Sequence, residues 1–285
     1  MKNSPLKFII VTIATLTTPI DAGAADRLRI ATEGAFPPWN AMTPAGELVG
    51  FEVDLARDLC RRMEADCEIV AQAWDGILPG LQQGRYDAIM AGMAITDARV
   101  TKVDFAGPYA TEPTVLATRA ESPLRDLSFQ VDPVDLDNAG PATEAALAAF
   151  ARGLAGMTVG VQVSTIQAAF VERHLPGIRV REYGKLDEAA LDLAADRLDA
   201  VLGSRSAVNA LRSADAPLVL VGLSFTRGVL GRGVGVAVRK GDVARKTAFD
   251  DAIAAAQRDG TVQTLSIRWF GFDVSIHPHA SIHPH

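Results

Sequence analysis

Beyond residue 27, the first part of the chain alternates between short apolar runs and a segment in which apolar residues are spaced four apart. Leu28–Thr32 and Cys67–Ala71 are short apolar runs of the strand type. Between them, apolar residues recur at every fourth position from Phe51 to Met63 with charged residues in between, which is the spacing of one buried helical face. This pattern predicts a strand, a helix and a second strand in succession.

A second helix and a third strand follow along the chain. Asp75 is a good N-cap residue and predicts the start of a helix, and Gly84 predicts its end. Residues 86–90 form the next apolar strand pattern. The resulting order, βαβαβ, predicts a parallel sheet with right-handed crossovers.

The same order of elements returns in the second half of the chain. The predicted strands are residues 157–161, 178–183 and 199–202. The predicted helices between them begin at the caps Ser164 and Asp187. Residues 85–90 and 197–202 are also similar in sequence, Arg-Tyr-Asp-Ala-Ile-Met against Arg-Leu-Asp-Ala-Val-Leu. Two such units predict an α/β protein of two lobes, each with a parallel-dominated sheet flanked by helices.

The remaining segments complete the expected division into lobes. Residues 121–156 are rich in Pro, Asp and Ala, include a predicted helix near 143–152, and are expected on the surface of the second lobe. A strand over 233–238 and helices over 242–258 and 262–270 are expected to return to the first lobe, so that two connections join the lobes. The expected division is a signal peptide over 1–25, the first lobe over 26–112 and 222–273, the second lobe over 113–221, and a disordered tail over 274–285.

The N-terminal residues have the pattern of a secretory signal peptide. Lys2 and Lys7 accompany a largely apolar stretch over residues 8–20, and residues 22–24, Ala-Gly-Ala, are small enough for a signal peptidase. The stretch is shorter than a membrane anchor, which needs about 18–20 unbroken apolar residues. Export is therefore expected.

Composition and charge narrow the class of protein further. The chain is 48% hydrophobic and 22% charged, as in globular proteins. Its net charge of −6 is spread along the chain with no basic block, which argues against nucleic acid as a partner. The only two cysteines are Cys60 and Cys67, and export makes a disulfide between them the default expectation, with two free thiols as the alternative.

Candidate binding residues follow from the predicted sheets. Ligands of open parallel sheets bind beyond the carboxyl ends of the strands, and a cleft between two lobes is a preferred site. The candidates in the first lobe are Glu33, Phe36, Trp74, Ala91, Gly92, Ala94, Thr96 and Arg99. Those in the second lobe are Gln162, Ser164, Thr165 and Ser204.

These residue types suit a ligand that carries a negative and a positive group. Thr96 is expected to cap a helix, so that Arg99 and the N–H groups of the helix start could bind a carboxylate. Glu33 could bind a distal ammonium or guanidinium group between the rings of Phe36 and Trp74. Ordinary roles remain open: a surface ion pair of Arg99 with a nearby aspartate, a solvated strand end for Glu33, and core packing for the two rings.

The sequence contains no recognisable catalytic set. Four of the five histidines lie in the tail, in two copies of Ser-Ile-His-Pro-His, and His174 lies near a predicted helix end. There is no nucleophile elbow, no His-Glu-x-x-His pattern and no phosphate-binding loop. We therefore expect a binding protein without a cofactor or a structural metal, whose tail would bind metal only adventitiously.

Several motifs resemble those of the periplasmic polar amino acid binding proteins of ABC importers. They are Ala-Thr-Glu-Gly at 31–34, Gly-Phe-Glu-Val-Asp-Leu at 50–55, Asp-Ala-Ile-Met at 87–90, Ile-Thr at 95–96 with Arg99, the pair Cys60 and Cys67, and Asp-Gly-Thr at 259–261. Residues 72–77, 231–236 and 269–271 are more similar still to the binders of opines of the nopaline and octopine type. The resemblance covers residues 27–273.

The resemblance implies a role for each candidate residue. Arg99 would bind the α-carboxylate, with help from the backbone of Gly92 and Ala94 and from Thr165 of the other lobe. The two aromatic rings would flank the ligand side chain, and Glu33 would bind its distal positive group. The fold implied is the type II periplasmic-binding-protein fold, with hinge strands near residues 111–115 and 221–225.

The resemblance also implies a periplasmic monomer that delivers its ligand to an inner-membrane ABC permease. Ser204 stands where amino acid binders carry an Asp for the α-ammonium group, which favours a substituted amine or a second carboxylate. Opines of the nopaline or octopine type therefore rank beside arginine, ornithine, lysine and histidine as ligands. Two alternatives remain: an exported cyclohexadienyl dehydratase-like lyase that uses Glu33 as its acid or base, and a ligand-sensing receptor subunit.

Overall fold

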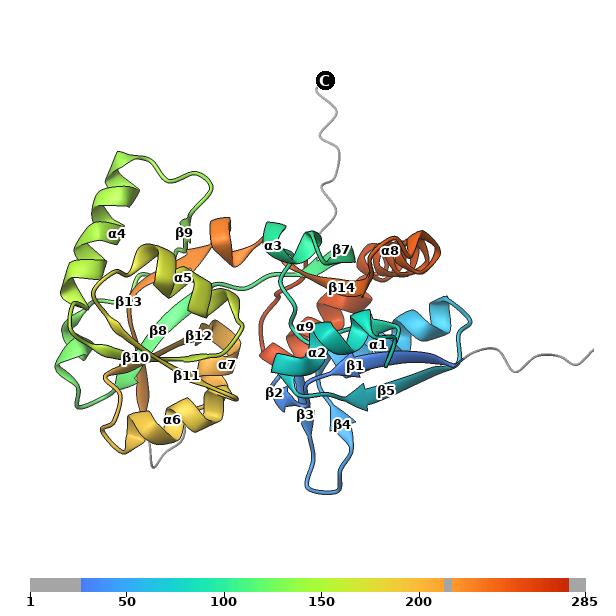
Figure 1. The fold of residues 1–285 in the computed structure, drawn as a ribbon, viewed down its shortest axis with the longest axis horizontal. Helices are drawn as coiled ribbons and strands as arrows, with labels where there is room; N and C mark the ends of the chain where they lie inside the picture. Colours follow the sequence, from blue (N-terminus) through green and yellow to red (C-terminus); the bar gives the residue numbers. More distant parts are fainter. Residues whose placement is uncertain (1–26, 213–216, 277–285) are drawn as a thin grey trace, which may run out of the picture.

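Two lobes lie side by side in the computed structural model, which describes residues 27–212 and 217–276 (Figure 1). The first lobe is built on a five-stranded sheet. Its strands in spatial order are β5 (Cys67–Ala71), β1 (Leu28–Thr32), β6 (Ala88–Ile89), β14 (Val234–Arg239) and β7 (Val103–Ala110). Strands β5, β1 and β6 are parallel, and β14 runs antiparallel to both of its neighbours. The predicted βαβαβ unit is therefore present, and β14 and β7 extend it.

The second lobe repeats this plan with one more strand. Its strands in spatial order are β11 (Arg179–Tyr183), β10 (Thr158–Gln162), β12 (Ala200–Ser204), β8 (Thr114–Arg119), β13 (Leu218–Thr226) and β9 (Val134–Asp135). The first three are parallel, and β8 runs antiparallel to β12 and β13. The second predicted unit is confirmed in the same order of elements.

Helices cover both faces of the first sheet, because successive strand residues point to opposite sides. They are α1 (Phe51–Arg62), α2 (Ile77–Gln82), the four-residue α3 (Asp97–Val100), α8 (Val243–Arg258) and α9 (Thr261–Phe270). Ile30 packs with residues of α1, α8 and α9, whereas its neighbour Ala31 packs with residues of α2. Phe51, Leu55 and Leu59 are completely buried, which confirms the predicted face of α1.

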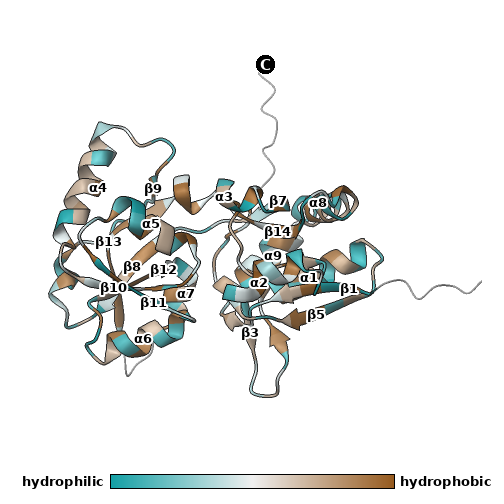
Figure 2. Cartoon of the chain, viewed as in Figure 1, coloured by the Kyte–Doolittle hydropathy of each residue, from teal (hydrophilic) through white to brown (hydrophobic). Residues whose placement is uncertain are grey.

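The second sheet is covered in the same way. Its helices are α4 (Pro141–Gly153), α5 (Ile166–His174), α6 (Leu186–Ala194) and α7 (Arg205–Ala210). Leu202 of β12 packs in a cluster with α4 and α5, and Val201 packs in a cluster with α6 and α7. Figure 2 shows hydrophobic residues along β8 in this lobe and a mixture of hydrophilic and hydrophobic residues on helices around it such as α6. Each lobe therefore has its own core on both sides of its sheet.

Two chain segments cross between the lobes. The first crossing is residues 111–113, between β7 and β8. The second is residues 231–233, which lead to β14 from a 3-10 turn (Gly228–Leu230) that packs in the core of the second lobe. The second crossing lies later than the expected hinge at 221–225 and the expected lobe boundary at 221. Strand β13 stays in the second sheet through Thr226, because its end pairs with β9 beyond an irregularity between Val221 and Phe225.

Three helix starts differ from the sequence expectation. Asp75 lies inside a 3-10 turn, Trp74–Gly76, that precedes α2. The N-cap of α5 is Thr165 and not Ser164, and the N-cap of α6 is Lys185, so that Asp187 lies in the first turn. At α5 two favourable cap residues, Ser164 and Thr165, are adjacent, whereas α6 begins at a lysine that the cap preferences do not select. Cap preferences therefore fix a helix start only to within one or two residues.

The start of the expected disordered tail is ordered instead. The amide of Thr111 donates to the carbonyl of Val274 at 2.9 Å, and the amide of Ile276 donates to the carbonyl of Tyr109 at 3.0 Å. Val274 is buried in the first lobe. The rest of the tail and the expected signal peptide lie outside the described residues.

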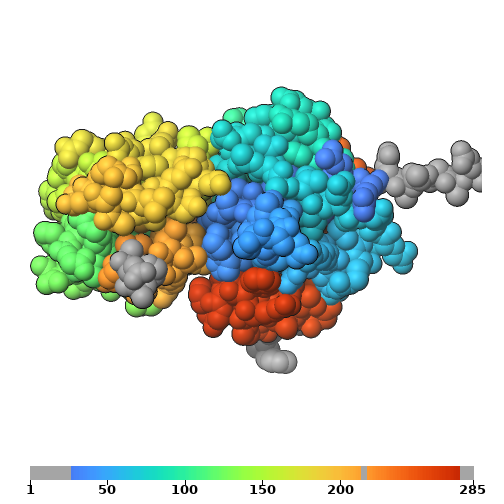
Figure 3. All heavy atoms as spheres, turned by 90° about the horizontal axis from the view of Figure 1, so that it is seen from below, coloured from blue at the N-terminus to red at the C-terminus, as the bar shows by residue number. Residues whose placement is uncertain are grey.

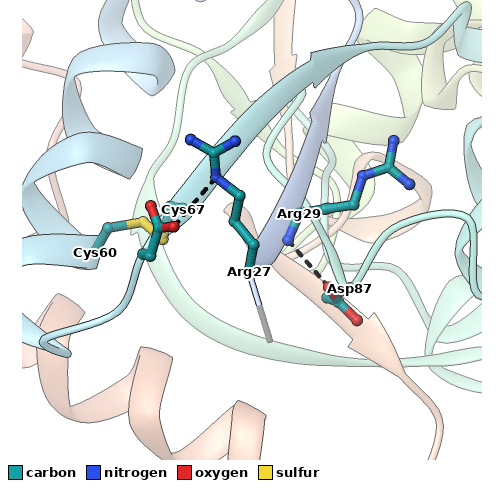
Figure 4. Close-up of a disulfide and its surroundings, with 6 residues drawn as sticks. Arg27, Arg29, Cys60, Cys67 and Asp87 are labelled. Atoms are coloured by element: carbon teal, nitrogen blue, oxygen red, sulfur yellow. Dashed lines mark hydrogen bonds and ion pairs between the residues drawn. A yellow bond between two sulfur atoms is a disulfide. The ribbon is translucent and has the colours of Figure 1, made fainter. Parts of the chain in front are cut away.

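Cys60 and Cys67 form the expected disulfide (Figure 4). It joins the last turn of α1 to the start of β5, the edge strand of the first sheet. None of the helices within residues 27–212 and 217–276 is long and apolar enough to cross a membrane.

Candidate functional site

A pocket lies between the two lobes and gathers most of the predicted binding residues. From the first lobe it is lined by Glu33, Phe36, Trp74, Ala91, Gly92, Ala94 and Arg99, and from the second by Gln162, Thr165 and Ser204. Thr96 and Ser164 do not line it and instead border a neighbouring groove. Figure 3 shows the second lobe, in yellow and orange, against the blue residues of the first lobe along this boundary.

Arg99 has no acidic partner among the described residues. Its guanidinium donates to the carbonyl of Ala94 at 3.0 Å and to the carbonyl of Ser164 at 3.3 Å, and it lies 5.2 Å from the ring centre of Trp74. The aspartates that could have paired with it are engaged elsewhere, Asp97 by Arg232 and Asp104 by Lys240. The surface ion pair considered for Arg99 is therefore not formed.

The charge of Arg99 persists although the side chain is enclosed. Burial lowers the pKa of its guanidinium to about 10, which still leaves it protonated at neutral pH. The hydroxyl of Thr96 caps α3 and accepts from the Arg99 amide at 3.2 Å, which fixes the start of the helix as predicted. An enclosed cation that contacts only carbonyls and an aromatic ring is a suitable binding group for an anion.

Glu33 lies in the loop after β1 and faces the second lobe. Its Oε1 accepts a hydrogen bond from Nε2 of Gln162 at 2.7 Å. Burial raises the pKa of Glu33 to about 7, and this effect outweighs the hydrogen bond from Gln162 and the positive charge of Lys185, which favour the carboxylate. Glu33 is therefore poised to change its charge near neutral pH.

The two predicted aromatic residues line the pocket from different segments. Trp74 is 9% exposed, and its Nε1 donates to the carbonyl of Ser164 at 3.4 Å. Phe36, on β2 (Ala35–Phe36), stacks near Trp39 with ring centres 6.3 Å apart. Phe36 also lies so close to Gly92 that a Cβ there would come within 2.7 Å of its ring.

Buried Glu52 positions two loops of the first lobe. Both of its carboxylate oxygens accept from the Gly92 amide, at 2.7 and 2.8 Å, and one accepts from Nδ2 of Asn40 at 3.0 Å. Oδ1 of Asn40 in turn accepts from the Gly34 amide at 2.8 Å, and the Tyr109 hydroxyl also donates to Glu52. Burial raises the pKa of Glu52 against these hydrogen bonds. This one side chain thus fixes the loops that follow β1 and β6.

Ser164 connects the lobes through its backbone. Its φ angle of 60° is left-handed, which is uncommon for a residue with a side chain. In this conformation its carbonyl accepts from both Arg99 and Trp74 of the first lobe. The neighbouring Thr165 caps α5, where its hydroxyl accepts from the Ala168 amide at 3.2 Å.

Glu112, in the first crossing, is the main lining residue that sequence reasoning missed. Its Oε1 accepts from Nε1 of Trp39 at 2.7 Å and from the Ser206 hydroxyl at 2.6 Å, and its Oε2 accepts from the Ser206 amide at 2.8 Å. Burial raises the pKa of Glu112, and the hydrogen bonds from Ser206 and Trp39 oppose that rise. The rule that ligands bind beyond the ends of parallel strands does not select residues of the crossings. The signal that could have identified Glu112 is an acidic residue inside a predicted hinge.

Comparisons with known proteins assign the family. The family model of the bacterial extracellular solute-binding proteins, family 3, matches residues 28–272. The chain belongs to this family. The lobes, the double crossing and the pocket are then those of a solute-binding protein with the type II fold.

The similar proteins are binders of amino acids and related compounds. The octopine-binding periplasmic protein of Rhizobium meliloti is 37% identical over 273 residues, which cover 88% of this chain and 92% of that protein. The L-arginine-binding protein of Pseudomonas aeruginosa is 33% identical over 258 residues, covering 88% and 91%. A solved structure of a periplasmic His/Glu/Gln/Arg/opine family-binding protein from Silicibacter pomeroyi, in complex with lysine, is 31% identical, has a TM-score of 0.69, and is matched over 88% of this chain and all of that one.

Proposed function

We propose that this solute-binding protein captures a small metabolite with one acidic and one distal cationic end, either an opine of the nopaline or octopine type or a cationic amino acid. The observation that supports this most directly is the enclosed guanidinium of Arg99, which has no acidic partner among the described residues. Glu33 supplies the opposite charge in the same pocket.

Seven of the predicted lining residues have a role in this proposal. Arg99 binds the carboxylate together with backbone groups of Gly92 and Ala94 and the hydroxyl of Thr165. The rings of Phe36 and Trp74 flank the apolar part of the ligand, and cation–π contact adds to the binding of its charged end. Glu33 then pairs with the distal ammonium or guanidinium group.

Capture involves closure of the two lobes about the crossings. Residues 114–230 form one lobe and the flanking segments form the other. A ligand that touches both lobes therefore favours the closed state. The protein is exported by its N-terminal signal peptide, acts as a monomer in the periplasm, and delivers the ligand to an ABC permease of the inner membrane.

A ligand screen tests the proposed function. Purified protein is heated with arginine, ornithine, lysine, histidine, octopine or nopaline, and hits are measured by calorimetry. A ligand at about a hundred times its Kd stabilises the folded state by about 2.7 kcal/mol, which raises the melting temperature by several degrees. No shift with any of the six ligands would contradict the proposal.

The lyase alternative rests on Glu33. A partly buried carboxyl whose pKa lies near 7 is suited to donate or accept a proton during catalysis. Incubation with prephenate or arogenate, followed by chromatography of the products, separates the two functions. A binding protein leaves both compounds unchanged, whereas a lyase of this type consumes at least one of them.

A further inference from the structure

Glu112 occupies a special place among the residues that line the pocket. It lies in the first crossing, between the last residue of β7 and the first of β8, and so belongs to neither sheet. Its hydrogen bonds join Trp39 of the first lobe to Ser206 of the second. The side chain keeps an intermediate exposure, unlike the fully buried Trp39 beside it.

The carboxylate of Glu112 has room for one further donor. A carboxylate offers about four acceptor positions, two on each oxygen. Oε1 accepts from the indole of Trp39 and the hydroxyl of Ser206, whereas Oε2 accepts only from the Ser206 amide. One position on Oε2 is left, on a residue that faces the pocket.

The hydroxyl of Ser204 is a second group without a hydrogen-bond partner among the described residues, and it lies near the Glu112 carboxylate. Ser204 Oγ is buried and has no hydrogen-bond partner among the described residues. It lies close enough to Glu112 to favour the charge on its carboxylate, although the geometry falls short of a hydrogen bond. Both residues line the pocket, so two free acceptor positions lie together at the first crossing.

Glu112 also lacks a cationic partner among the described residues. Burial disfavours its charged form, and a positive group of the ligand would restore it. Glu33 and Glu112 are the two carboxylates among the described lining residues, and Arg99 is the enclosed cation. The arrangement suits a ligand with a carboxylate and two separate positive nitrogens.

We propose that Oε2 of Glu112 and the hydroxyl of Ser204 receive the N–H groups of the ligand's α-nitrogen, so that this pair selects ligands with a charged amino or imino group beside the carboxylate. The inference rests on the proposed function. It adds that the amino nitrogen is recognised by a carboxylate of the chain crossing together with the hydroxyl at the end of β12.

A cycle that changes both protein and ligand tests this assignment. The proteins are wild type and Glu112→Gln, with Glu182→Gln on the exposed face of β11 as the matched control. The ligands are arginine and 5-guanidinopentanoate, which lacks only the amino group, and octopine with its analogue in which CH₂ replaces the amine nitrogen. Calorimetry gives the Kd of each combination, and thermal unfolding checks that every variant is folded.

We expect Glu112→Gln to lose affinity only for ligands that carry the α-nitrogen. Glu112→Gln should weaken binding of arginine or octopine by about tenfold or more and change binding of the analogue without the α-nitrogen less than about twofold. An equal loss for both members of a pair would show that Glu112 only braces Trp39 and Ser206, and would overturn the inference, as would no loss at all.

The same experiment separates this inference from the proposed function. Wild-type protein that binds none of the six ligands of the screen would contradict the proposed function itself. Wild-type protein that binds either ligand, combined with parallel losses in Glu112→Gln, would contradict only the assignment of Glu112.

Discussion

Arg99 is the side chain on which ligand binding depends most at the scale of single residues. It is enclosed and charged, and among the described residues only carbonyls and a ring surround it. We expect Arg99→Ala to weaken ligand binding by tenfold or more, because a hydrogen bond to a charged group contributes about 1.5–3 kcal/mol. Isothermal titration calorimetry measures the change.

The control for this prediction is Arg232→Ala. Arg232 is an exposed arginine nearby that pairs with Asp97 and does not line the pocket. Its removal should leave the affinity within about twofold of wild type, because exposed ion pairs contribute about 0–1 kcal/mol to stability and this one makes no contact with the ligand. If Arg99→Ala bound the ligand with the same affinity as wild type and Arg232→Ala, Arg99 would have no part in binding.

Glu33 makes ligand binding depend on pH. The groups that face it are Gln162, Lys185, Asp187 and Asp75, and burial dominates their combined effect, so that its pKa is about 7. A cationic ligand end binds the deprotonated form. Affinity should therefore be highest above about pH 7 and should fall below it by up to about tenfold per pH unit, with release of a proton on binding.

Calorimetry between about pH 5.5 and 8.5 measures this dependence. Glu33→Gln is the matched variant, because it keeps the hydrogen-bonding shape and removes the titration. Its affinity should be lower at high pH and nearly constant across the range. A wild-type affinity that also stayed constant would remove Glu33 from the contact with the ligand's cation.

Site residues that the sequence predicts differ from those that it does not predict in how far along the chain their partners lie. Arg99, Trp74 and Glu33 follow strand ends, and local patterns predict strand ends well. Glu112 and Glu52 act through partners far away in sequence, Ser206 and Gly92. Nothing in the local pattern identifies these partners, so the hydrogen bonds of both residues are known only from the folded structure.

At the scale of elements, the loop after β6 sets the shape of the pocket wall. Gly92 adopts a φ of 63°, and a Cβ there would come within 2.7 Å of Phe36. We expect Gly92→Ala to displace Phe36, reduce ligand affinity at least about tenfold and lower stability by more than the 1–2 kcal/mol typical of left-handed alanine. Calorimetry and urea unfolding measure the two effects.

Gly46→Ala separates backbone strain from steric conflict. Gly46 has a similar φ of 82°, but a Cβ there would meet nothing within 4 Å. This variant should lose stability by about 1–2 kcal/mol and keep its ligand affinity. If Gly92→Ala behaved in the same way as Gly46→Ala, the contact between Gly92 and Phe36 would not shape the site.

Element boundaries show where sequence patterns stop being informative. Strands β1 and β5 begin and end where the apolar runs predict, because both are short runs bounded by polar residues. The start of α5 is one residue later than predicted, since Ser164 takes a left-handed conformation in which its carbonyl bonds to the first lobe. Strand β13 extends past the predicted hinge because β9, from the segment before α4, pairs with its end.

At the scale of the whole molecule, direct hydrogen bonds join the two lobes across the pocket. Gln162 bonds to Glu33, the Ser164 carbonyl accepts from Arg99 and Trp74, and other donors join the lobes near the crossings. A ligand must therefore replace some of these contacts when it enters. The balance between open and closed forms depends on their combined strength.

Removing one interlobe contact should shift this balance. We expect Gln162→Ala to increase the radius of gyration of the ligand-free protein in small-angle X-ray scattering, because the open form gains population. Saturating ligand should reduce the difference from wild type. Gln83→Ala, which removes an exposed glutamine outside the pocket, should leave the curve unchanged, and an unchanged curve for Gln162→Ala would mean that this contact does not favour closure.

The two crossings also determine the order in which the lobes can be completed during synthesis. The sheet of the second lobe has all its strands once Thr226 has been made. The sheet of the first lobe still lacks β14, which sits between β6 and β7, and the core around Ile30 lacks Phe249 and Ile253. Chains are made from the N-terminus, so the lobe that begins the polypeptide is the last to finish folding.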